Sequence, residues 1–133
     1  MKLTEIQSQL KSASPVGNKT QIIAVSKLQP IEKIKDLYNQ GHRQFAENYI
    51  QEALEKIEAL SDLEIEWHLI GRLQKNKAKM AVGRFALIHS VDSLELLKLI
   101  NRLAGEKGLQ QKVLLQINAA NEDTKAGFDV EEI

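Results

Sequence analysis

Residues 22–27 read Ile-Ile-Ala-Val-Ser-Lys, a short apolar run that ends in a lysine. Apolar and partly β-branched residues over this length are typical of a buried strand. Lys27 would then lie at the carboxyl end of that strand, where parallel β/α folds keep their binding and catalytic groups. A lysine amine at such a position can attack a carbonyl compound and form a Schiff base. We therefore expect Lys27 to be a covalent anchor for a cofactor.

Similar strand patterns recur along the chain, and a helical pattern follows most of them. We expect further strands at residues 44–47, 65–70, 85–89 and 113–117. Helical spacing of apolar residues predicts a leader helix that ends before a break at 14–18, and later helices at 30–41, 50–60, 74–82 and 92–105. A strict alternation of strands and helices predicts a parallel sheet wrapped by helices.

Two details of these helices are also predicted. The charged residues of the 50–60 helix are expected on its solvent side. They are Glu52, Glu55, Lys56 and Glu58. Asp92 and Glu95 are expected to form an acidic capping box at the start of the 92–105 helix.

The α/β alternation fits both an open doubly wound sheet and a (β/α) barrel of the TIM type. Two features favour the barrel: no Gly-x-Gly-x-x-Gly turn follows the first strand, and polar residues end every strand. The chain has 133 residues, fewer than the roughly 250 of a complete eight-stranded barrel. We therefore expect a single domain, residues 1–133, that forms the N-terminal portion of a barrel truncated after its fifth strand.

Composition narrows the kind of ligand. Acidic and basic residues number 18 each, so the net charge is zero and gives no general electrostatic reason to bind nucleic acid or membrane. The basic stretch 72–84 is better explained as a solvated helical face. The chain lacks cysteine, and no apolar run approaches the roughly 20 residues of a membrane span. These features favour a cytoplasmic protein with a small-molecule ligand.

Polar residues at the strand ends form the candidate site. In chain order they are Lys27, Glu47 to Tyr49, His68 with Gly71 beyond it, His89 with Ser90, and Asn118. Parallel strands bring such residues to one edge of the sheet. Taken singly, His68 could be a hydrogen-bonded core histidine and Asn48 a helix cap. The spacing of the three histidines supports no metal site, and no Gly-x-Ser-x-Gly turn supports a serine nucleophile.

Five segments together identify a family. They are AVSK at 24–27, FAENYIQE at 45–52, WHLIGRLQKNK at 67–77, IHSVDS at 88–93 and QINAANEDTKAGF at 116–128. In this order and spacing they closely resemble the pyridoxal 5′-phosphate (PLP) homeostasis protein family, whose fold is similar to the barrel domain of alanine racemase.

The resemblance implies a role as well as a fold. It implies PLP held as a Schiff base on Lys27, with Asn48 and His68 as further cofactor-binding residues and with no catalytic residue. The implied role is intracellular vitamin B6 homeostasis without catalytic turnover. Family members continue with further strands that carry a phosphate-binding loop and an arginine facing the pyridine nitrogen.

Two alternatives stay open at this stage. A PLP-dependent amino-acid racemase would need a second acid/base on the opposite face of the cofactor, typically a tyrosine, and the sequence places neither Tyr38 nor Tyr49 there. A barrel fragment that binds no cofactor would instead act through self-association or complementation at its exposed sheet edges. The oligomeric state is left open.

Overall fold

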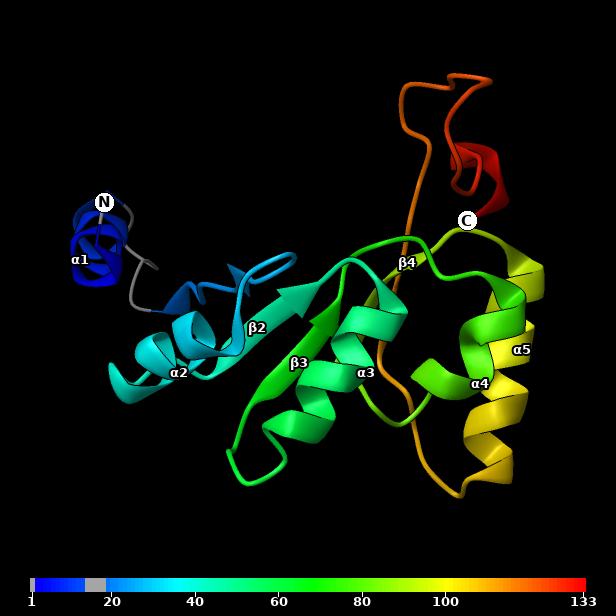
Figure 1. Cartoon of the computed structure of the whole chain (residues 1–133). Coiled ribbons are helices and arrows are strands. Elements are labelled where there is room, and N and C mark those ends of the chain that lie inside the picture. The colour runs from blue at the N-terminus through cyan, green and yellow to red at the C-terminus, as the bar shows by residue number, and fades with distance from the viewer. Residues whose placement is uncertain (1, 14–18) are drawn as a thin grey trace.

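The computed structural model describes residues 2–13 and 19–133 (Figure 1), so the break predicted at 14–18 lies outside the described residues. Its centre is a sheet of five parallel strands in the order β1-β2-β3-β4-β5. The strands are β1 (Ala24–Val25), β2 (Gln44–Glu47), β3 (Glu66–Leu69), β4 (Leu87–Val91) and β5 (Val113–Leu115). This order has no reversal point, which is the arrangement of a β/α barrel and differs from that of a doubly wound sheet. The predicted parallel α/β architecture is confirmed.

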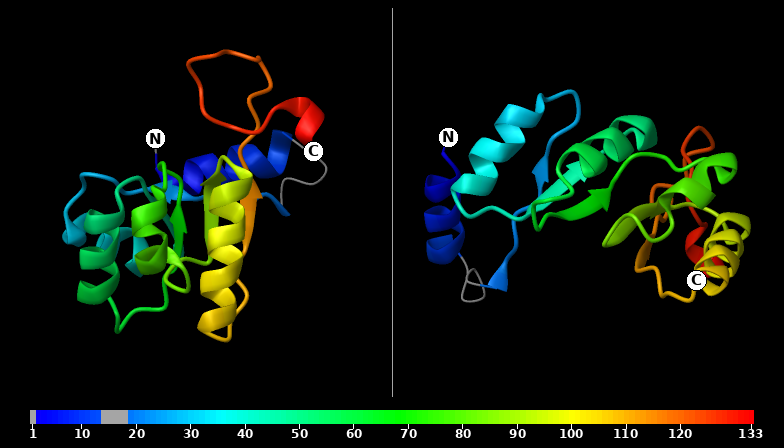
Figure 2. Two further views of the ribbon diagram at one scale, coloured as in Figure 1. Left: turned by 90° about the vertical axis from the view of Figure 1, so that its right-hand side faces the viewer. Right: turned by 60° about the horizontal axis from the view of Figure 1, so that its bottom comes forward.

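One helix precedes β1, a 3₁₀ turn follows β5, and the remaining helical segments connect consecutive strands. In chain order the helical segments are α1 (Leu3–Ala13), α2 (Ile31–Asn39), α3 (Ile50–Ala59), the 3₁₀ turn η2 (Lys75–Lys77), α4 (Ala78–Ala81), α5 (Leu94–Glu106) and the 3₁₀ turn η3 (Val130–Glu132). The helices α2 to α5 lie along one side of the sheet (Figures 1 and 2). Right-handed crossovers in a parallel sheet put successive helices on the same side when the strands follow one another in order.

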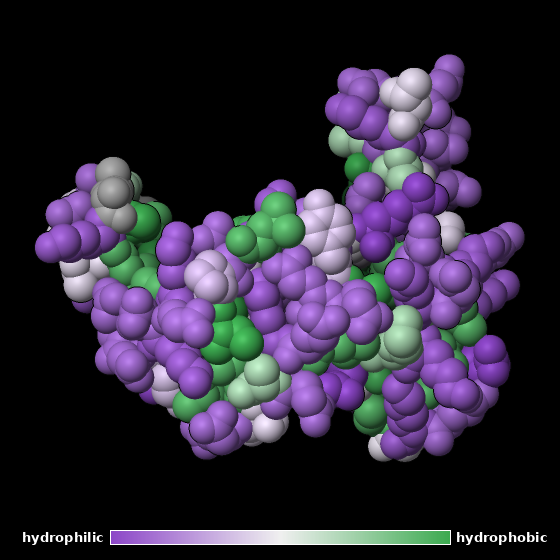
Figure 3. Space-filling view, in the orientation of Figure 1, coloured by the Kyte–Doolittle hydropathy of each residue, from purple (hydrophilic) through white to green (hydrophobic). Residues whose placement is uncertain are grey.

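The core lies between the sheet and these helices. Strand residues whose side chains point to the helices are fully buried, for example Phe45, Leu69 and Ile88. On the opposite side of the sheet Val25 and Leu114 are 52% and 48% exposed. Figure 3 shows mainly hydrophilic side chains over the outer surface of the helices, with apolar ones visible between them. The side of the sheet that faces the helices is therefore well buried, whereas the opposite side is exposed at the outer strands and buried at Ala46 and His68 of the central ones.

Several predicted boundaries are wrong in detail. Strand β1 has two residues where 22–26 was expected, and β4 begins at Leu87 although a strand was predicted from 85. The 74–82 helix is divided into η2 and α4. Phe85 is buried although it precedes β4, so its apolar character reflects the core and not strand pairing.

The predicted capping box is wrong as well. The residue that caps α5 is Ser93, whose Oγ accepts a hydrogen bond from the Leu96 N–H at 3.2 Å. Serine and aspartate are both good N-caps, so a sequence with Asp92 and Ser93 side by side leaves two registers available. Glu95 forms an ion pair with Lys75 instead.

Candidate functional site

Lys27 lies just beyond β1 at the carboxyl edge of the sheet. The preceding Ser26 N–H donates to the Ala46 carbonyl oxygen at 2.9 Å, which extends the pairing of β1 with β2 by one residue. Lys27 is exposed, and its amine forms no hydrogen bond or ion pair with the residues that the structure describes. A small molecule in solution can therefore reach this amine.

Asn48 lies at the same edge, directly after β2. Its Oδ1 is buried and has no hydrogen-bond partner among the described residues. A buried acceptor without a partner is costly, and in native structures it often marks the place of a water, an ion or a ligand. Asn48 therefore has an acceptor available for a bound molecule.

Gly71 explains how the edge is packed next to Asn48. A Cβ atom at this position would lie 1.9 Å from the Asn48 carbonyl oxygen, closer than real Cβ atoms approach any neighbour. Only glycine lets the segment after β3 lie this close to the segment after β2. The Ser90 Oγ donates to the Gly71 carbonyl oxygen at 2.6 Å, which attaches the end of β4 to the same place.

His68 is a strand residue, as the strand predicted at 65–70 requires. It lies within β3, paired with Ala46 and Leu87, and only 4% of it is exposed. Its Nδ1 is 2.9 Å from His89 Nε2, and its Nε2 is 3.1 Å from Glu66 Oε1. Both ring nitrogens are therefore engaged within the sheet, and no described contact links His68 to Lys27. Its role beside a cofactor stays a prediction.

The histidine pair also affects protonation. Burial lowers the pKa of His89, and the nearby His68 lowers it further by charge repulsion. A neutral imidazole can donate from one nitrogen and accept on the other, as a hydrogen bond between two histidines requires. His89 is thus kept mostly uncharged at neutral pH.

A polar network at the start of α3 was missed by the sequence analysis. Lys56 was expected on the solvent side of its helix, but it is only 6% exposed, so that prediction is wrong. Its Nζ donates to Glu47 Oε1 at 2.8 Å, to Glu52 Oε1 at 2.6 Å and to the Ser26 carbonyl oxygen at 2.7 Å. Burial of the charge is compensated because every ammonium proton has an acceptor.

The acidic partners of Lys56 are less completely bonded, because the buried Glu47 Oε2 has no hydrogen-bond partner among the described residues. Glu47 is fully buried, and its Oε1 also accepts from the Ser26 Oγ at 2.6 Å. The hydrogen bond from Lys56 lowers the pKa of Glu52, burial raises it in part, and the hydrogen bond from the Leu28 N–H lowers it again. The available sequence signal was the spacing of Glu52 and Lys56, which are one helical turn apart.

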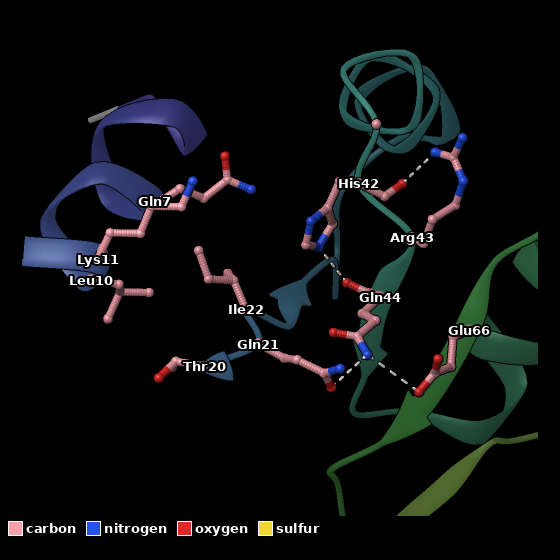
Figure 4. A pocket seen from close by; sticks show the side chains of 11 residues that line it. Gln7, Leu10, Lys11, Thr20, Gln21, Ile22, His42, Arg43, Gln44 and Glu66 are labelled. Atoms are coloured by element: carbon pink, nitrogen blue, oxygen red, sulfur yellow. Dashed lines mark hydrogen bonds between the residues drawn. The ribbon is translucent and has the colours of Figure 1, made fainter. Parts of the chain in front are cut away.

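The opposite edge of the sheet contains a pocket that does not involve Lys27. It is formed by residues that precede β1 and β2 or begin a strand, including Gln21, His42, Gln44 and Glu66 (Figure 4). The Gln44 Nε2 donates to Gln21 Oε1 at 3.0 Å, and His42 Nε2 is 2.6 Å from the Gln44 carbonyl oxygen. In β/α barrels this amino-terminal edge generally serves stability, so we assign the pocket no ligand.

Within residues 2–13 and 19–133, no group of three or more His, Asp or Glu side chains is arranged to hold a metal ion. Over the same residues, no helix combines the length and apolar character needed to cross a membrane.

Comparisons with known proteins agree with the fold and with the sequence motifs. The model of the family "Alanine racemase, N-terminal domain" matches residues 2–133. The chain is 40% identical to the pyridoxal phosphate homeostasis protein of Aquifex aeolicus over 131 residues, which are 98% of this chain and 58% of that protein. It is 45% identical to the protein of the same name from Synechocystis sp. over 113 residues, or 84% of this chain and 52% of that one. The chain thus spans little more than half the length of these relatives.

Solved structures give the same result. PipY of Synechococcus elongatus without PLP matches with a TM-score of 0.86 and 42% identity, covering 98% of this chain and 60% of that one. PipY with PLP bound matches with a TM-score of 0.80 and 41% identity, covering 96% and 58%. An alanine racemase from Clostridium difficile shares the fold, with a TM-score of 0.69 and 18% identity. The match covers 94% of this chain and 32% of that one. The predicted resemblance is confirmed.

Proposed function

The chain belongs to the alanine racemase N-terminal domain family, and we propose that residues 1–133 form one PLP-binding domain that holds the cofactor as a Schiff base on Lys27. Its role is PLP homeostasis in the cell, without catalytic turnover. The observation that carries the proposal is the exposed Lys27 at the carboxyl end of β1. Support comes from relatives named pyridoxal phosphate homeostasis protein and from PipY, whose structure is known with PLP bound.

The chemistry needs only an accessible amine and an aldehyde. PLP supplies an aldehyde that condenses with amines. The Lys27 Nζ would condense with this aldehyde when PLP is bound, and the aldehyde oxygen would leave as water with two hydrogens from the amine. No oxidant or metal takes part. The reaction is reversible, as a protein that stores or delivers the cofactor requires.

The other residues have supporting parts. Asn48 offers its buried and unpartnered Oδ1 as a hydrogen-bond acceptor for the ligand. His68 is proposed as a further cofactor-binding residue, and the contacts of its ring nitrogens with His89 and Glu66 fix the orientation of its ring. Gly71 keeps the edge beside Asn48 compact.

The racemase alternative depends on a tyrosine acting as an acid/base. Tyr38 is engaged elsewhere, because its hydroxyl accepts from the Glu64 N–H at 3.3 Å and its ring contacts the Arg43 guanidinium. Tyr49 is 54% exposed next to Asn48 and is the tyrosine to test. In D₂O with PLP and L-alanine we expect no exchange of the α-proton by NMR; exchange that disappears in Tyr49→Phe would instead support an enzyme.

The direct test is covalent capture. The chain is incubated with PLP, its absorbance spectrum is recorded, the Schiff base is reduced with borohydride, and the modified peptide is located by mass spectrometry. We expect one adduct, on Lys27, that is absent from Lys27→Ala and present in the control Lys35→Ala, which removes an exposed lysine of α2. No adduct, or adducts spread over many lysines, would refute the proposal.

A further inference from the structure

The two neighbours of Lys27 in the chain are both held by side chains of β2 and α3. The Ser26 carbonyl oxygen accepts from Lys56 Nζ at 2.7 Å, and the Ser26 Oγ donates to Glu47 Oε1 at 2.6 Å. On the other side, the Leu28 N–H donates to Glu52 Oε1 at 2.6 Å. The main chain is therefore fixed immediately before and after Lys27, while the lysine side chain is exposed.

Lys56 connects these contacts. Its three hydrogen bonds reach the Ser26 carbonyl oxygen, Glu47 and Glu52, which uses the full donor capacity of an ammonium group. Charge-assisted hydrogen bonds between buried groups are short and directional. Through them the position of Ser26 depends directly on Lys56, and the position of Leu28 depends on it through Glu52.

Leu28 has a backbone conformation that needs such support. Its φ is 57°, in the left-handed region that non-glycine residues seldom adopt. Residues remain in this region when surrounding contacts fix them, and such strain often lies next to a functional group. The bond from the Leu28 N–H to Glu52 is the side-chain contact that holds this turn.

We infer that Lys56 is a positioning residue for Lys27: with Glu47 and Glu52 it fixes the main chain on both sides of the lysine that takes the cofactor. The inference rests on the proposed function of Lys27. A lysine that projects from fixed backbone keeps its amine in a limited region next to the rest of the site, which raises its rate of reaction over that of a freely mobile surface lysine. The consequence is selectivity for Lys27 among the many lysines of the chain.

The test compares variants of α3 by two measurements. The first is amide hydrogen exchange at Leu28 by NMR, which needs no cofactor. The second is the rate of PLP attachment at Lys27, quantified after borohydride reduction. The variants are Glu52→Ala, which removes the acceptor of the Leu28 N–H, and Glu52→Gln, which keeps a carbonyl oxygen there. Lys56→Met removes the ammonium group, and Glu55→Ala is the control because Glu55 is exposed on the same helix.

Loss of a hydrogen bond to a charged group should change the Leu28 amide exchange rate and the rate of PLP attachment at Lys27 by about tenfold or more each. We expect faster Leu28 exchange and slower attachment at Lys27 in Glu52→Ala, partial recovery of both in Glu52→Gln, and wild-type behaviour in Glu55→Ala. Lys56→Met should give the same changes as Glu52→Ala. If Lys56→Met does not fold, the result for Glu52→Ala alone decides whether the network positions Lys27.

Two results would overturn the inference in different ways. Attachment to Lys27 at the wild-type rate in Glu52→Ala would show that the network does not position the lysine, while leaving the proposed function intact. A wild-type chain that forms no Lys27 adduct would overturn the proposed function, and the positioning role with it.

Discussion

Replacing Lys56 with methionine should strongly destabilise the chain. The methionine side chain is similar in length but removes three hydrogen bonds, and it leaves the fully buried Glu47 without its cation. Breaking a buried ion pair on one side costs roughly 3–5 kcal/mol, because the remaining charge stays desolvated. With a denaturant dependence of about 2 kcal/mol per molar urea for a chain of this size, the unfolding midpoint should fall by roughly 2 M.

The assay is urea unfolding followed by the fluorescence of Trp67, the single tryptophan, which is 5% exposed and reports on the core. The control is Lys98→Met, an exposed position on α5 where the change should stay within about 0.5 kcal/mol. A second measurement introduces Lys56→Met into a Glu47→Gln background, which keeps the oxygen but removes the charge. There the cost should fall to about 1–2 kcal/mol. An equal cost in both backgrounds would refute the argument that the unpaired Glu47 charge is responsible.

Three further predictions concern single positions. Gly71→Ala should cost more than about 2 kcal/mol in thermal unfolding because its Cβ would overlap the Asn48 carbonyl oxygen, whereas Gly105→Ala, in a helix with open space around it, should gain roughly 0.5–1 kcal/mol; equal effects would contradict the packing argument. Burial lowers the pKa of His89, so the contribution of the neutral His89 to the free energy of unfolding should be fully present above pH about 6.5 and decrease as the pH falls below it. Urea midpoints measured at several pH values should therefore decline less in His89→Gln than in the wild type. Phe45→Ala, at a fully buried position, should lower the free energy of unfolding by roughly 3–5 kcal/mol, and a loss below about 1 kcal/mol would place Phe45 outside the core.

The overall fold could be predicted because its signals are local and repeated. Each strand is an apolar run and each helix has an apolar stripe, so the alternation and the parallel sheet follow from the sequence. The position of Lys27 at the carboxyl edge follows from the same pattern, since it ends the apolar run that contains β1. Element boundaries were less predictable. Phe85 is a buried core residue outside β4, so its apolar side chain gives a misleading start for that strand. The start of α5 depends on which of Asp92 and Ser93 acts as its N-cap, and this is set by how the chain enters the helix.

The network around Lys56 could not be predicted from helical periodicity. That periodicity assigns a charged residue to the solvent side unless its partners are known. The acceptors of Lys56 lie 4, 9 and 30 residues away along the chain, and two of them come from the loop after β1 and from the end of β2. The sequence does show Glu47 at a strand end and Glu52 one helical turn before Lys56. Only the tertiary structure brings both carboxylates to a single ammonium group.

The environments of Lys27 and Lys56 decide which of these two lysines can react. A Schiff base requires an amine with a free lone pair that is open to its carbonyl partner. Lys56 meets neither condition, because it is buried with three acceptors that each require a proton on its nitrogen. Lys27 is exposed and unbonded among the described residues, yet its main chain is fixed on both sides. Reactivity and rigidity make opposite demands on one amine. In the proposed function two lysines share these demands: Lys27 would bind the cofactor, and Lys56 would hold the main chain beside it.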